Sequence, residues 1–482
     1  MWKCLANPNS QTKDVIICTV PWTDSSVPLM APATLRPIVE KTGLSCLAID
    51  WNVEVYQYTR THPLKDDLIR FFFDEHVTNG TKEILDHIFL TAAQQIVSWK
   101  PKYVGLSLFS YVCQHSAKWL AYYIKKLDPN IQILAGGAGC LSAFTGPSPY
   151  IDQMLNLKLF DHHIRGDGEN SLYELLTGNS NYSGINSATW KEMTKEELRS
   201  MPMPVYDDYI FEMYDKKVLP LVGSRGCVRQ CKFCDYIANW KQFQWRTADD
   251  IFAEMVAQSQ KYNIHNFKFQ DSLTNGNQKE FFRLIELLGN YNQTAEHKFR
   301  WSGYYIFRNP TNTSEREWEL LLLSGVDTLV VGIENLNEHI RYDIGKKFSN
   351  DAIDFHLAHA KKHNIKILML NIVGYITETR KDIDFARQWL HEHLEYRDTI
   401  IRIQWGGTLG IFPNTYLEQH KDKLGIKMIG PQPNLWINQS IGSTPAVRAA
   451  WVTELNTLSR ELGYKVADNL DNHYILETLM NA

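Results

Sequence analysis

The sequence predicts an α/β protein made of two successive units, each built on a parallel sheet, with a small helical extension at the C-terminal end. Three observations predict this class. Short apolar runs rich in β-branched residues alternate with stretches of helical spacing along most of the 482 residues. The runs are nearly continuous in apolar residues, which is typical of strands buried on both faces of a parallel sheet. One polar segment, 178–206, interrupts the alternation and separates the two units.

The first unit is predicted to contain five strands. They fall at 14–20, 44–50, 103–108, 131–134 and 159–164, and helical spacing occurs between them at 31–41, 82–99 and 116–127. Ligands of such sheets bind at the carboxyl ends of the strands. The sequence places Ser107 at one of these ends and Gly136 and Gly137 at another, so this edge is a candidate binding site. Ordinary turn chemistry between strand and helix is the competing explanation for the glycines.

The second unit is predicted to contain six strands. They fall at 218–222, 267–270, 301–307, 328–333, 367–373 and 401–405, and helices fit between them at 247–262, 279–291, 314–324, 351–363 and 379–393. Six strands that alternate with helices indicate a partial (β/α) barrel. The tail is predicted to add two helices, 445–462 and 471–480, packed on that barrel.

Composition excludes several classes of protein. Hydrophobic residues are 44% and charged residues 22% of the chain, which is ordinary for a globular protein and argues against disorder. The formal charge is −4, so nucleic acid is an unlikely partner. We find no apolar run long enough to span a membrane and no secretory signal at the N-terminus. We therefore expect a cytoplasmic protein.

Three of the eight cysteines lie together. Cys227, Cys231 and Cys234 have the spacing C-x3-C-x2-C and follow directly on the first strand of the second unit. A structural zinc site normally needs four protein ligands, and the nearby His265 and His297 lack the pair spacing of a zinc finger. An electron-transfer iron–sulfur cluster uses four cysteines, so three would leave one iron of a 4Fe–4S cluster open to an external ligand. The missing fourth ligand is therefore the informative feature.

This spacing resembles that of the radical S-adenosylmethionine (radical SAM) superfamily. The resemblance implies that Cys227, Cys231 and Cys234 bind three irons of a 4Fe–4S cluster and that the open iron takes the amino and carboxylate groups of SAM. Phe233 matches the aromatic residue that lies near the adenine. One electron from the cluster would cleave SAM to methionine and a 5′-deoxyadenosyl radical, which abstracts a hydrogen atom from the substrate. An electron donor such as flavodoxin or ferredoxin is the implied partner.

Other segments of the second unit carry the same resemblance. The segment 267–272 resembles the strand that ends near the SAM amino group, with Gln270 and Asp271 in place of the common Gly-Gly-Glu. An acidic acceptor suits an ammonium group, so Asp271 is the expected contact, and a helix-capping aspartate is the competing explanation. The stretch 325–346 resembles the fourth-strand segment and implies that Glu334 faces the active site near SAM. Looser matches occur at 301–308, 373–379 and 411–417.

The first unit resembles the cobalamin-binding subclass of these enzymes. The matching segments are 29–52, 103–108, 133–137 and 164–169. The resemblance implies a cobalamin site that includes Ser107, Gly136 and Gly137. A D-x-H-x-x-G pattern at 161–166 is the kind that supplies a histidine to cobalt in other cobalamin proteins. Here it follows the serine and glycine elements instead of preceding them, so we interpret it as a coincidence.

These observations predict a domain order and a function. The domains are a Rossmann-like cobalamin-binding domain at 1–177, a connector at 178–206, a partial (β/α)6, TIM-like radical SAM barrel at 207–420 and a C-terminal helical extension at 421–482. The predicted function is cobalamin-dependent radical SAM methylation of an unactivated carbon in a small molecule or peptide. One alternative is a rearrangement, cyclisation or other non-methylating reaction, with or without cobalamin. The other is a non-catalytic iron–sulfur module.

Overall fold

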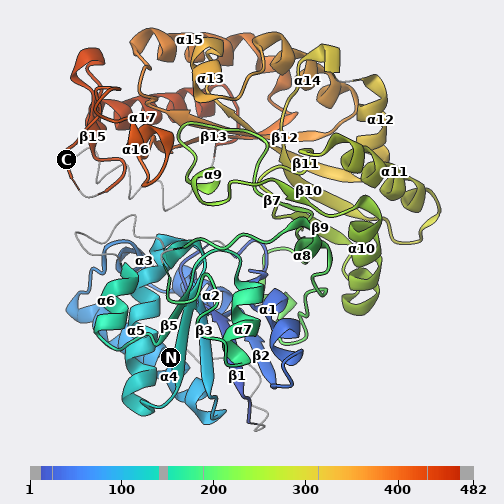
Figure 1. The fold of residues 1–482 in the computed structure, drawn as a ribbon. Helices are drawn as coiled ribbons and strands as arrows, with labels where there is room; N and C mark the ends of the chain where they lie inside the picture. The colour runs from blue at the N-terminus through green and yellow to red at the C-terminus, as the bar shows by residue number, and fades with distance from the viewer. Residues whose placement is uncertain are drawn as a thin grey trace. The chain divides into compact units, whose positions relative to one another are not determined.

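The computed structural model describes residues 12–23, 25–140, 150–187, 189–312, 314–430 and 432–466. The chain divides into two compact units, Met1–Pro220 and Leu221–Ala482, and Figure 1 colours it from blue to red along the sequence. Strand β6 (Leu219–Leu221) crosses the boundary between the units. No helix among the described residues combines the length and the apolar character needed to cross a membrane.

Unit 1 contains a five-stranded sheet in the order β2-β1-β3-β4-β5, and every pair of neighbouring strands is parallel. The strands are β1 (Val15–Thr19), β2 (Cys46–Ile49), β3 (Tyr103–Ser107), β4 (Gln132–Gly136) and β5 (His162–Ile164). The five strands predicted from the sequence are thereby confirmed. Because Ile17 lies opposite both Ala48 and Gly105, the carboxyl ends of the three neighbouring strands reach the same edge of the sheet.

Helices lie between these strands and after the last of them. They are α1 (Ala31–Glu40), α2 (Trp51–Thr61), α3 (Lys65–Asp74), α4 (Asn79–Ser98), α5 (Gln114–Leu127), α6 (Tyr150–Asn156), α7 (Gly168–Leu176) and α8 (Lys195–Arg199), with 3-10 turns η1 (Tyr111–Cys113), η2 (Ala138–Cys140) and η3 (Phe211–Met213). Helices α2 and α3 are not among the predicted ones. Helix α4 begins before the predicted start at 82, because Thr78 and Thr81 form a capping box.

The sheet of unit 1 is apolar on both faces, as the sequence predicts. Ile16 and Cys18 belong to a large core cluster that includes residues of α2 to α5. Their neighbours Val15 and Ile17 belong to a second cluster that includes Val39 of α1 and residues of α7. Successive residues of a strand point to opposite faces, so a strand between two helical layers is apolar throughout.

Unit 2 contains a six-stranded sheet in the order β13-β12-β11-β10-β9-β6. The strands after β6 are β9 (Asn266–Phe269), β10 (Arg300–Tyr305), β11 (Val326–Glu334), β12 (Lys366–Val373) and β13 (Ile400–Thr408), and their neighbouring pairs are parallel. The strands therefore follow the order of the sequence, as in a partial (β/α) barrel. All six predicted strands are present.

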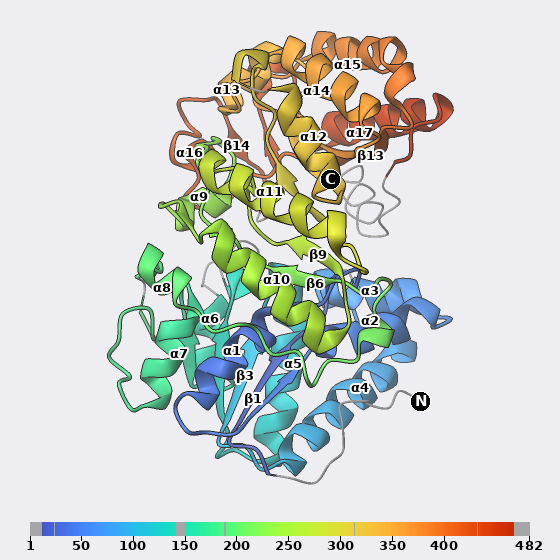
Figure 2. The same cartoon turned by 90° about the vertical axis from the view of Figure 1, so that its right-hand side faces the viewer.

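The helices of unit 2 lie between the strands of its sheet and after the last of them. They are α9 (Asp235–Asn239), α10 (Ala248–Tyr262), α11 (Gln278–Thr294), α12 (Glu315–Leu323), α13 (Glu338–Ile344), α14 (Asn350–Lys362), α15 (Arg380–Glu392), α16 (Tyr416–Gln419) and α17 (Pro445–Glu461), with 3-10 turns η4 (Pro310–Asn312), η5 (Leu394–Tyr396) and η6 (Gln439–Ile441). Figure 2 shows several of them along one face of the sheet. In β11, Leu329, Val331 and Ile333 are buried, whereas the alternate row that ends at Glu334 is partly exposed. That second row faces away from the helical layer.

The C-terminal part confirms one predicted helix. The helix expected at 445–462 is α17, and it packs on β13, where the indole of Trp405 donates a hydrogen bond to the hydroxyl of Ser459 at 2.8 Å. A short antiparallel pair, β14 (Lys427–Met428) and β15 (Trp436–Ile437), precedes it. The helix expected at 471–480 lies outside the described residues.

Candidate functional site

The cysteine loop follows β6 at the carboxyl end of the barrel. A short antiparallel pair, β7 (Ser224–Arg225) and β8 (Gln244–Trp245), closes the base of the loop that carries the three cysteines. Gly226 has a φ of +78°, and a Cβ atom there would lie 2.0 Å from the carbonyl oxygen of Gln242. Glycine is therefore required at the point where the two ends of the loop pass each other.

The far side of the cysteine loop is held by α13. The backbone N–H of Lys232 donates to the carbonyl of Ile344 at 2.9 Å, and its ammonium pairs with Asp343 at 2.5 Å. Gly345 has a φ of +106°, and a Cβ atom there would lie 2.9 Å from the carbonyl oxygen of Gln230. Segments more than a hundred residues apart in the sequence thus form one structure around the thiols.

The three thiols differ in their surroundings. Cys231 is 7% exposed and belongs to an apolar cluster with Ile344 and Tyr375, against which Phe233 and Cys234 also pack. Burial raises the pKa of Cys231 to about 12 and that of Cys234 to about 11. Cys227 is partly exposed, and the sulfur accepts a backbone hydrogen bond from Arg229 at 3.4 Å. Without a metal, the two buried thiols therefore keep their protons at neutral pH.

The donor set fits an iron–sulfur cluster better than a single ion. In the described part of the chain, no three His, Cys, Asp or Glu side chains converge on one metal position. A 4Fe–4S cluster does not need such convergence, because each thiolate binds a different iron. Soft thiolates in an apolar setting favour iron–sulfur chemistry, and metal binding displaces the thiol protons. The assignment of Cys227, Cys231 and Cys234 as the three cluster ligands stays a prediction.

Asp271 lies at the base of the cysteine loop. It is 3% exposed, and its two carboxylate oxygens accept hydrogen bonds from the N–H of Gly223 at 2.7 Å and the hydroxyl of Ser224 at 2.8 Å. Burial raises the pKa of Asp271 to about 6. The competing helix-cap role falls to Asn277, which accepts from the first turn of α11. Asp271 thus holds the strand–loop junction, and its contact with SAM stays a prediction.

Gln270 directly follows β9, and its side chain lies on the exposed side of the sheet. Its N–H donates to the carbonyl of Leu221 at 2.8 Å, which joins the end of β9 to the strand before the cysteine loop. Its side chain is exposed. The alternation along β9 places Gln270 in the row that also faces away from the helices in β11.

Glu334 ends β11 in an ion pair. Its φ is +65°, and its carboxylate lies 2.9 Å from the ammonium of Lys346. A Cβ atom on Gly332 would lie 2.3 Å from Glu334 Oε1 and 2.8 Å from Lys346 Nζ, so the pair packs directly on the strand backbone. Burial lowers the pKa of Lys346, but the charge and hydrogen bond of Glu334, together with the Cys231 and Cys227 thiols, raise it by more, so the net shift is upward. Lys346 ends the matched stretch 325–346, but no role was predicted for it.

Two further polar residues at this end of the barrel were not predicted. Tyr304 of β10 is 40% exposed; burial and the charge of Glu334 raise the pKa of its hydroxyl. Glu378 is buried in the turn after β12; it accepts from Asn335 Nδ2 at 2.5 Å and from the N–H of Tyr375 at 3.1 Å. Burial raises the pKa of Glu378 to about 7. Glu378 and Thr379 end the segment 373–379, which resembles a radical SAM segment, so that resemblance was the available signal for Glu378.

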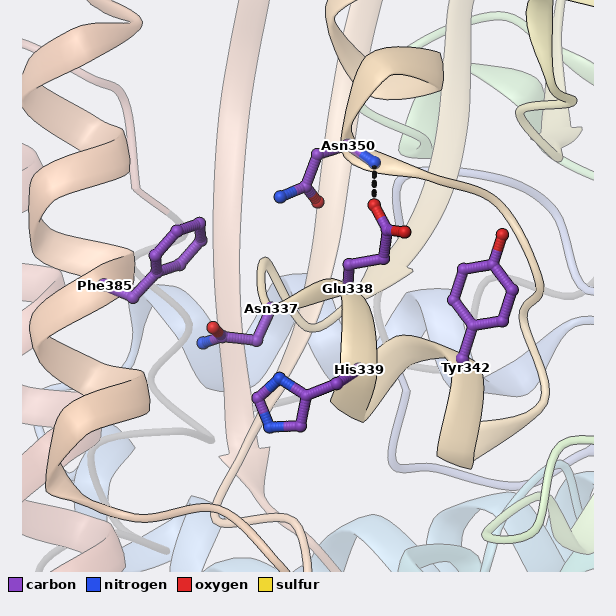
Figure 3. A pocket seen from close by; sticks show the side chains of 6 residues that line it. All are labelled: Asn337, Glu338, His339, Tyr342, Asn350 and Phe385. Atoms are coloured by element: carbon purple, nitrogen blue, oxygen red, sulfur yellow. Dashed lines mark hydrogen bonds between the residues drawn. The ribbon is translucent and has the colours of Figure 1, made fainter.

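A hollow of about 470 Å³ lies beside α13. Its lining comes from α13, the start of α14 and α15, and consists of Asn337, Glu338, His339, Tyr342, Asn350 and Phe385 (Figure 3). Within it the carboxylate of Glu338 accepts the backbone N–H of Asn350 at 2.6 Å. These polar contacts join two helices, and none of the predicted site residues lines the hollow.

In unit 1, the predicted cobalamin residues end two neighbouring strands. Ser107 of β3 lies opposite Gly136 of β4. Gly137 has a φ of +101°, and a Cβ atom there would lie 2.3 Å from the carbonyl oxygen of Leu108. The close contact between two loops therefore explains why residue 137 is a glycine. This is the turn chemistry that the sequence offers as the alternative to a cofactor role. Phe109, at the same edge, is 57% exposed.

The ends of β1 and β2 are filled by the chain itself. The buried carboxylate of Asp50 accepts from the hydroxyls of Thr19 and Tyr214, each at 2.6 Å. The side-chain oxygen of Asn52 accepts the N–H of Thr23 at 2.9 Å. The carboxyl ends of β1 and β2, which form half of the candidate binding edge, are therefore occupied by hydrogen bonds within the chain.

The D-x-H-x-x-G pattern lies on β5, at the edge of the sheet. The N–H of His163 donates to Asn186 Oδ1 at 2.9 Å, and its Nε2 lies 3.3 Å from the carbonyl of Ser187. Asp161 pairs with Lys125 at 2.7 Å. The histidine contacts a loop of its own unit, in keeping with the interpretation of the pattern as a coincidence.

Residues 221–390, which include the cysteine loop and most of the barrel, match the family model of the radical SAM superfamily. The chain carries a radical SAM domain. The protein is accordingly an enzyme with a radical SAM domain, and the alternative of a non-catalytic iron–sulfur module is set aside. A domain of this family works with a 4Fe–4S cluster and SAM, which the three thiols of this loop suit.

The sequence relatives are distant. This chain is 23% identical over 360 residues to an uncharacterized methyltransferase of Pyrococcus horikoshii, a match that covers 71% of this chain and 75% of the relative. It is also 23% identical over 294 residues to the anaerobic magnesium-protoporphyrin IX monomethyl ester cyclase of Synechocystis. That second match covers 56% of this chain and 54% of the cyclase.

Two solved structures share the fold over nearly the whole chain. The radical SAM methyltransferase TsrM of Kitasatospora setae, solved with cobalamin and a 4Fe–4S cluster, matches with a TM-score of 0.64 and 13% identity, covering 98% of this chain and 100% of TsrM. The cobalamin-dependent SAM radical enzyme OxsB, solved with aqua-cobalamin, matches with a TM-score of 0.65 and 14% identity, covering 94% of this chain and 67% of OxsB. At this identity the likeness establishes the fold: a Rossmann-like sheet unit followed by a radical SAM barrel.

Proposed function

We propose that the protein is a cobalamin-dependent radical SAM methyltransferase that methylates an unactivated carbon of a small molecule or peptide. The observation that carries the proposal is the presence, in one chain, of a five-stranded parallel-sheet unit ahead of a radical SAM barrel whose first loop holds three cysteine thiols. The fold likeness to TsrM and OxsB supports the same pairing of units.

In this proposal some residues of the barrel bind the iron–sulfur cluster and others bind SAM. Cys227, Cys231 and Cys234 hold the cluster, which when bound supplies one electron to SAM and leaves an iron open for its amino and carboxylate groups. Phe233 packs beside the thiols, where an aromatic face suits the adenine. The remaining contacts to SAM come from the inner side of the barrel, at Gln270, Asp271 and Glu334.

Unit 1 offers an edge that fits a large, flat cofactor. Phe109 is an exposed aromatic residue at the carboxyl end of β3, close in sequence to the half-buried hydroxyl-bearing Ser107. Phe109 lies at the edge where parallel sheets of this kind bind their ligands. Cobalamin bound there would carry the methyl group, with Ser107, Gly136 and Gly137 along its path. The fixed contacts of Gly137 limit that residue to shaping the loop.

The first test measures cofactors and SAM cleavage. Protein purified without oxygen from cells supplied with cobalamin should contain iron, sulfide and corrinoid, and with a one-electron donor it should convert SAM to 5′-deoxyadenosine. Cys231→Ala should abolish 5′-deoxyadenosine formation and leave corrinoid content unchanged, because the thiol lies in the barrel. Cys46→Ala, a buried cysteine of unit 1, is the matched control and should keep SAM cleavage. Continued SAM cleavage in Cys231→Ala would contradict the cluster assignment.

A non-methylating reaction is the second candidate. It is favoured by the likeness to a protein named as a cyclase. Methyl transfer from SAM produces S-adenosylhomocysteine as well as 5′-deoxyadenosine, whereas a rearrangement or cyclisation gives 5′-deoxyadenosine alone. The ratio of the two products with a candidate substrate therefore separates the two reactions. Iron and sulfide without corrinoid would keep the radical reaction and remove the methyl carrier.

A further inference from the structure

Lys346 is brought to the cysteine loop by the two residues before it. The carbonyl of Ile344 accepts the N–H of Lys232 at 2.9 Å, and Gly345 packs against the backbone of Gln230 and Cys231. A Cβ atom on Gly345 would lie 3.6 Å from the Cα of Cys231. The turn that carries Lys346 is therefore fixed against the segment that carries the thiols.

The ammonium of Lys346 is held in one position. It pairs with the carboxylate of Glu334 at 2.9 Å, and both side chains are mostly buried, with 15% and 12% of their surfaces exposed. Gly332 leaves the space that the pair occupies, since a Cβ atom there would collide with both charged groups. A buried ion pair of this kind is weakly screened by solvent, so its charges act on their neighbours over several ångströms.

The lysine end of the pair lies toward the thiols. Burial raises the pKa of Cys231, while the charge of Lys346 lowers it by more than the charge of Glu334 raises it. The Cys231 and Cys227 thiols in turn raise the pKa of Lys346, which places its ammonium within electrostatic reach of both. The pair is neutral overall but presents its positive end to the site of the cluster.

We propose that Lys346 is a positioning residue that sets the reduction potential of the cluster and holds Glu334 at the inner face of the barrel. The inference rests on the proposed cluster site at the three cysteines. Reduction adds one electron to the cluster, and a fixed positive charge beside the thiolates stabilises the added negative charge. Lys346 thus makes the cluster easier to reduce than the apolar surroundings alone would allow.

The test is a potentiometric titration of the reconstituted full-length protein, without SAM or substrate. Dithionite donates one electron to each cluster, and electron paramagnetic resonance measures the reduced fraction. Lys346→Met should lower the reduced-to-oxidised ratio at a fixed potential by roughly tenfold, which is about 59 mV for a one-electron couple. Lys347→Met removes an exposed neighbouring charge and should leave the ratio unchanged. Lys346→Arg keeps the charge and should stay near the wild type.

A substitution of Glu334 provides a second test, in which the reduced fraction is expected to change in the opposite direction. Glu334→Gln removes the negative end of the pair and should raise the reduced fraction at the same potential. The double variant Lys346→Met, Glu334→Gln should fall between the two single variants, because the two charges oppose each other. If Lys346→Met loads no cluster, the shift in Glu334→Gln decides the matter.

The outcomes separate this inference from the proposed function. Wild-type protein that binds no iron and sulfide would remove the cluster and the inference together. A wild type with a normal cluster, whose potential is the same in Lys346→Met as in Lys347→Met, would overturn only the role of Lys346. Equal potentials in Glu334→Gln and the wild type would count against it in the same way.

Discussion

Asp271 illustrates how burial changes what a single residue does. The sequence predicts an acceptor for the SAM ammonium, because a carboxylate ends the strand at the right point of the matched segment. The structure adds two hydrogen bonds, from Gly223 and Ser224, that use both carboxylate oxygens in holding the cysteine loop. The carboxylate of Glu334 is likewise already used within the chain, because it pairs with the ammonium of Lys346. At the residue scale, the sequence shows which positions carry a carboxylate, but it does not show which donor or cation each carboxylate binds.

The raised pKa of Asp271 predicts a pH-dependent stability. Its pKa is about 6 in the folded protein against 3.8 in a model peptide, so the ionised form costs about 3 kcal/mol of folding free energy above pH 6. Below pH 4 the group is neutral in both states and that cost is absent. Asp271→Asn should therefore unfold less readily than the wild type at pH 8, and the difference should shrink as the pH falls through 6 toward 4. Urea denaturation of both proteins at several pH values measures it; a pH-independent difference would contradict the burial argument.

The contacts between loops determine which glycines are required by the backbone. Gly136 and Gly137 are adjacent, and both belong to the segment that resembles cobalamin-binding enzymes, yet different atoms surround them. A Cβ atom at Gly136 would find its nearest neighbour at 3.9 Å, in Ile164, whereas one at Gly137 would overlap the backbone of Leu108 and require a positive φ. The element scale thus separates a residue that shapes the loop from one that is free to face a ligand.

This difference gives a matched pair of variants. Gly137→Ala should lower the free energy of unfolding of unit 1 by roughly 2 kcal/mol or more, because the backbone must shift to admit the methyl group. Gly136→Ala should leave the thermal stability near that of the wild type. If cobalamin passes over Gly136, the same variant should lose corrinoid content without losing stability. Unchanged corrinoid content in a stable Gly136→Ala protein would remove this residue from the proposed cobalamin site.

At the scale of the whole molecule, the chain holds two compact units with separate cores. The apolar clusters of the first sheet lie within Met1–Pro220, and the cluster around Cys231 lies within Leu221–Ala482. Ligands that bind one folded unit stabilise that unit by mass action. The two proposed cofactors therefore act on different parts of the chain.

Calorimetry of the full-length protein should show two unfolding transitions. Reconstitution of the iron–sulfur cluster should raise one transition temperature, and loading with cobalamin should raise the other. Cys231→Ala should remove the first shift and retain the second. A single transition that both cofactors raise together would contradict the assignment of each cofactor to its own unit.

The sequence by itself determined the class of each unit, the order of their strands and the presence of a three-cysteine loop. These are local properties, because apolar periodicity and Cys spacing depend on neighbours in the chain. The tertiary structure decided which polar groups meet: Lys346 with Glu334, Glu378 with Asn335, and Asp271 with the start of the cysteine loop. The contacts of Glu378 and Asp271 join residues 43 and 48 positions apart, and the pair of Lys346 with Glu334 spans α13; no local pattern encodes them. They arise because a parallel barrel brings the carboxyl ends of successive strands to one edge.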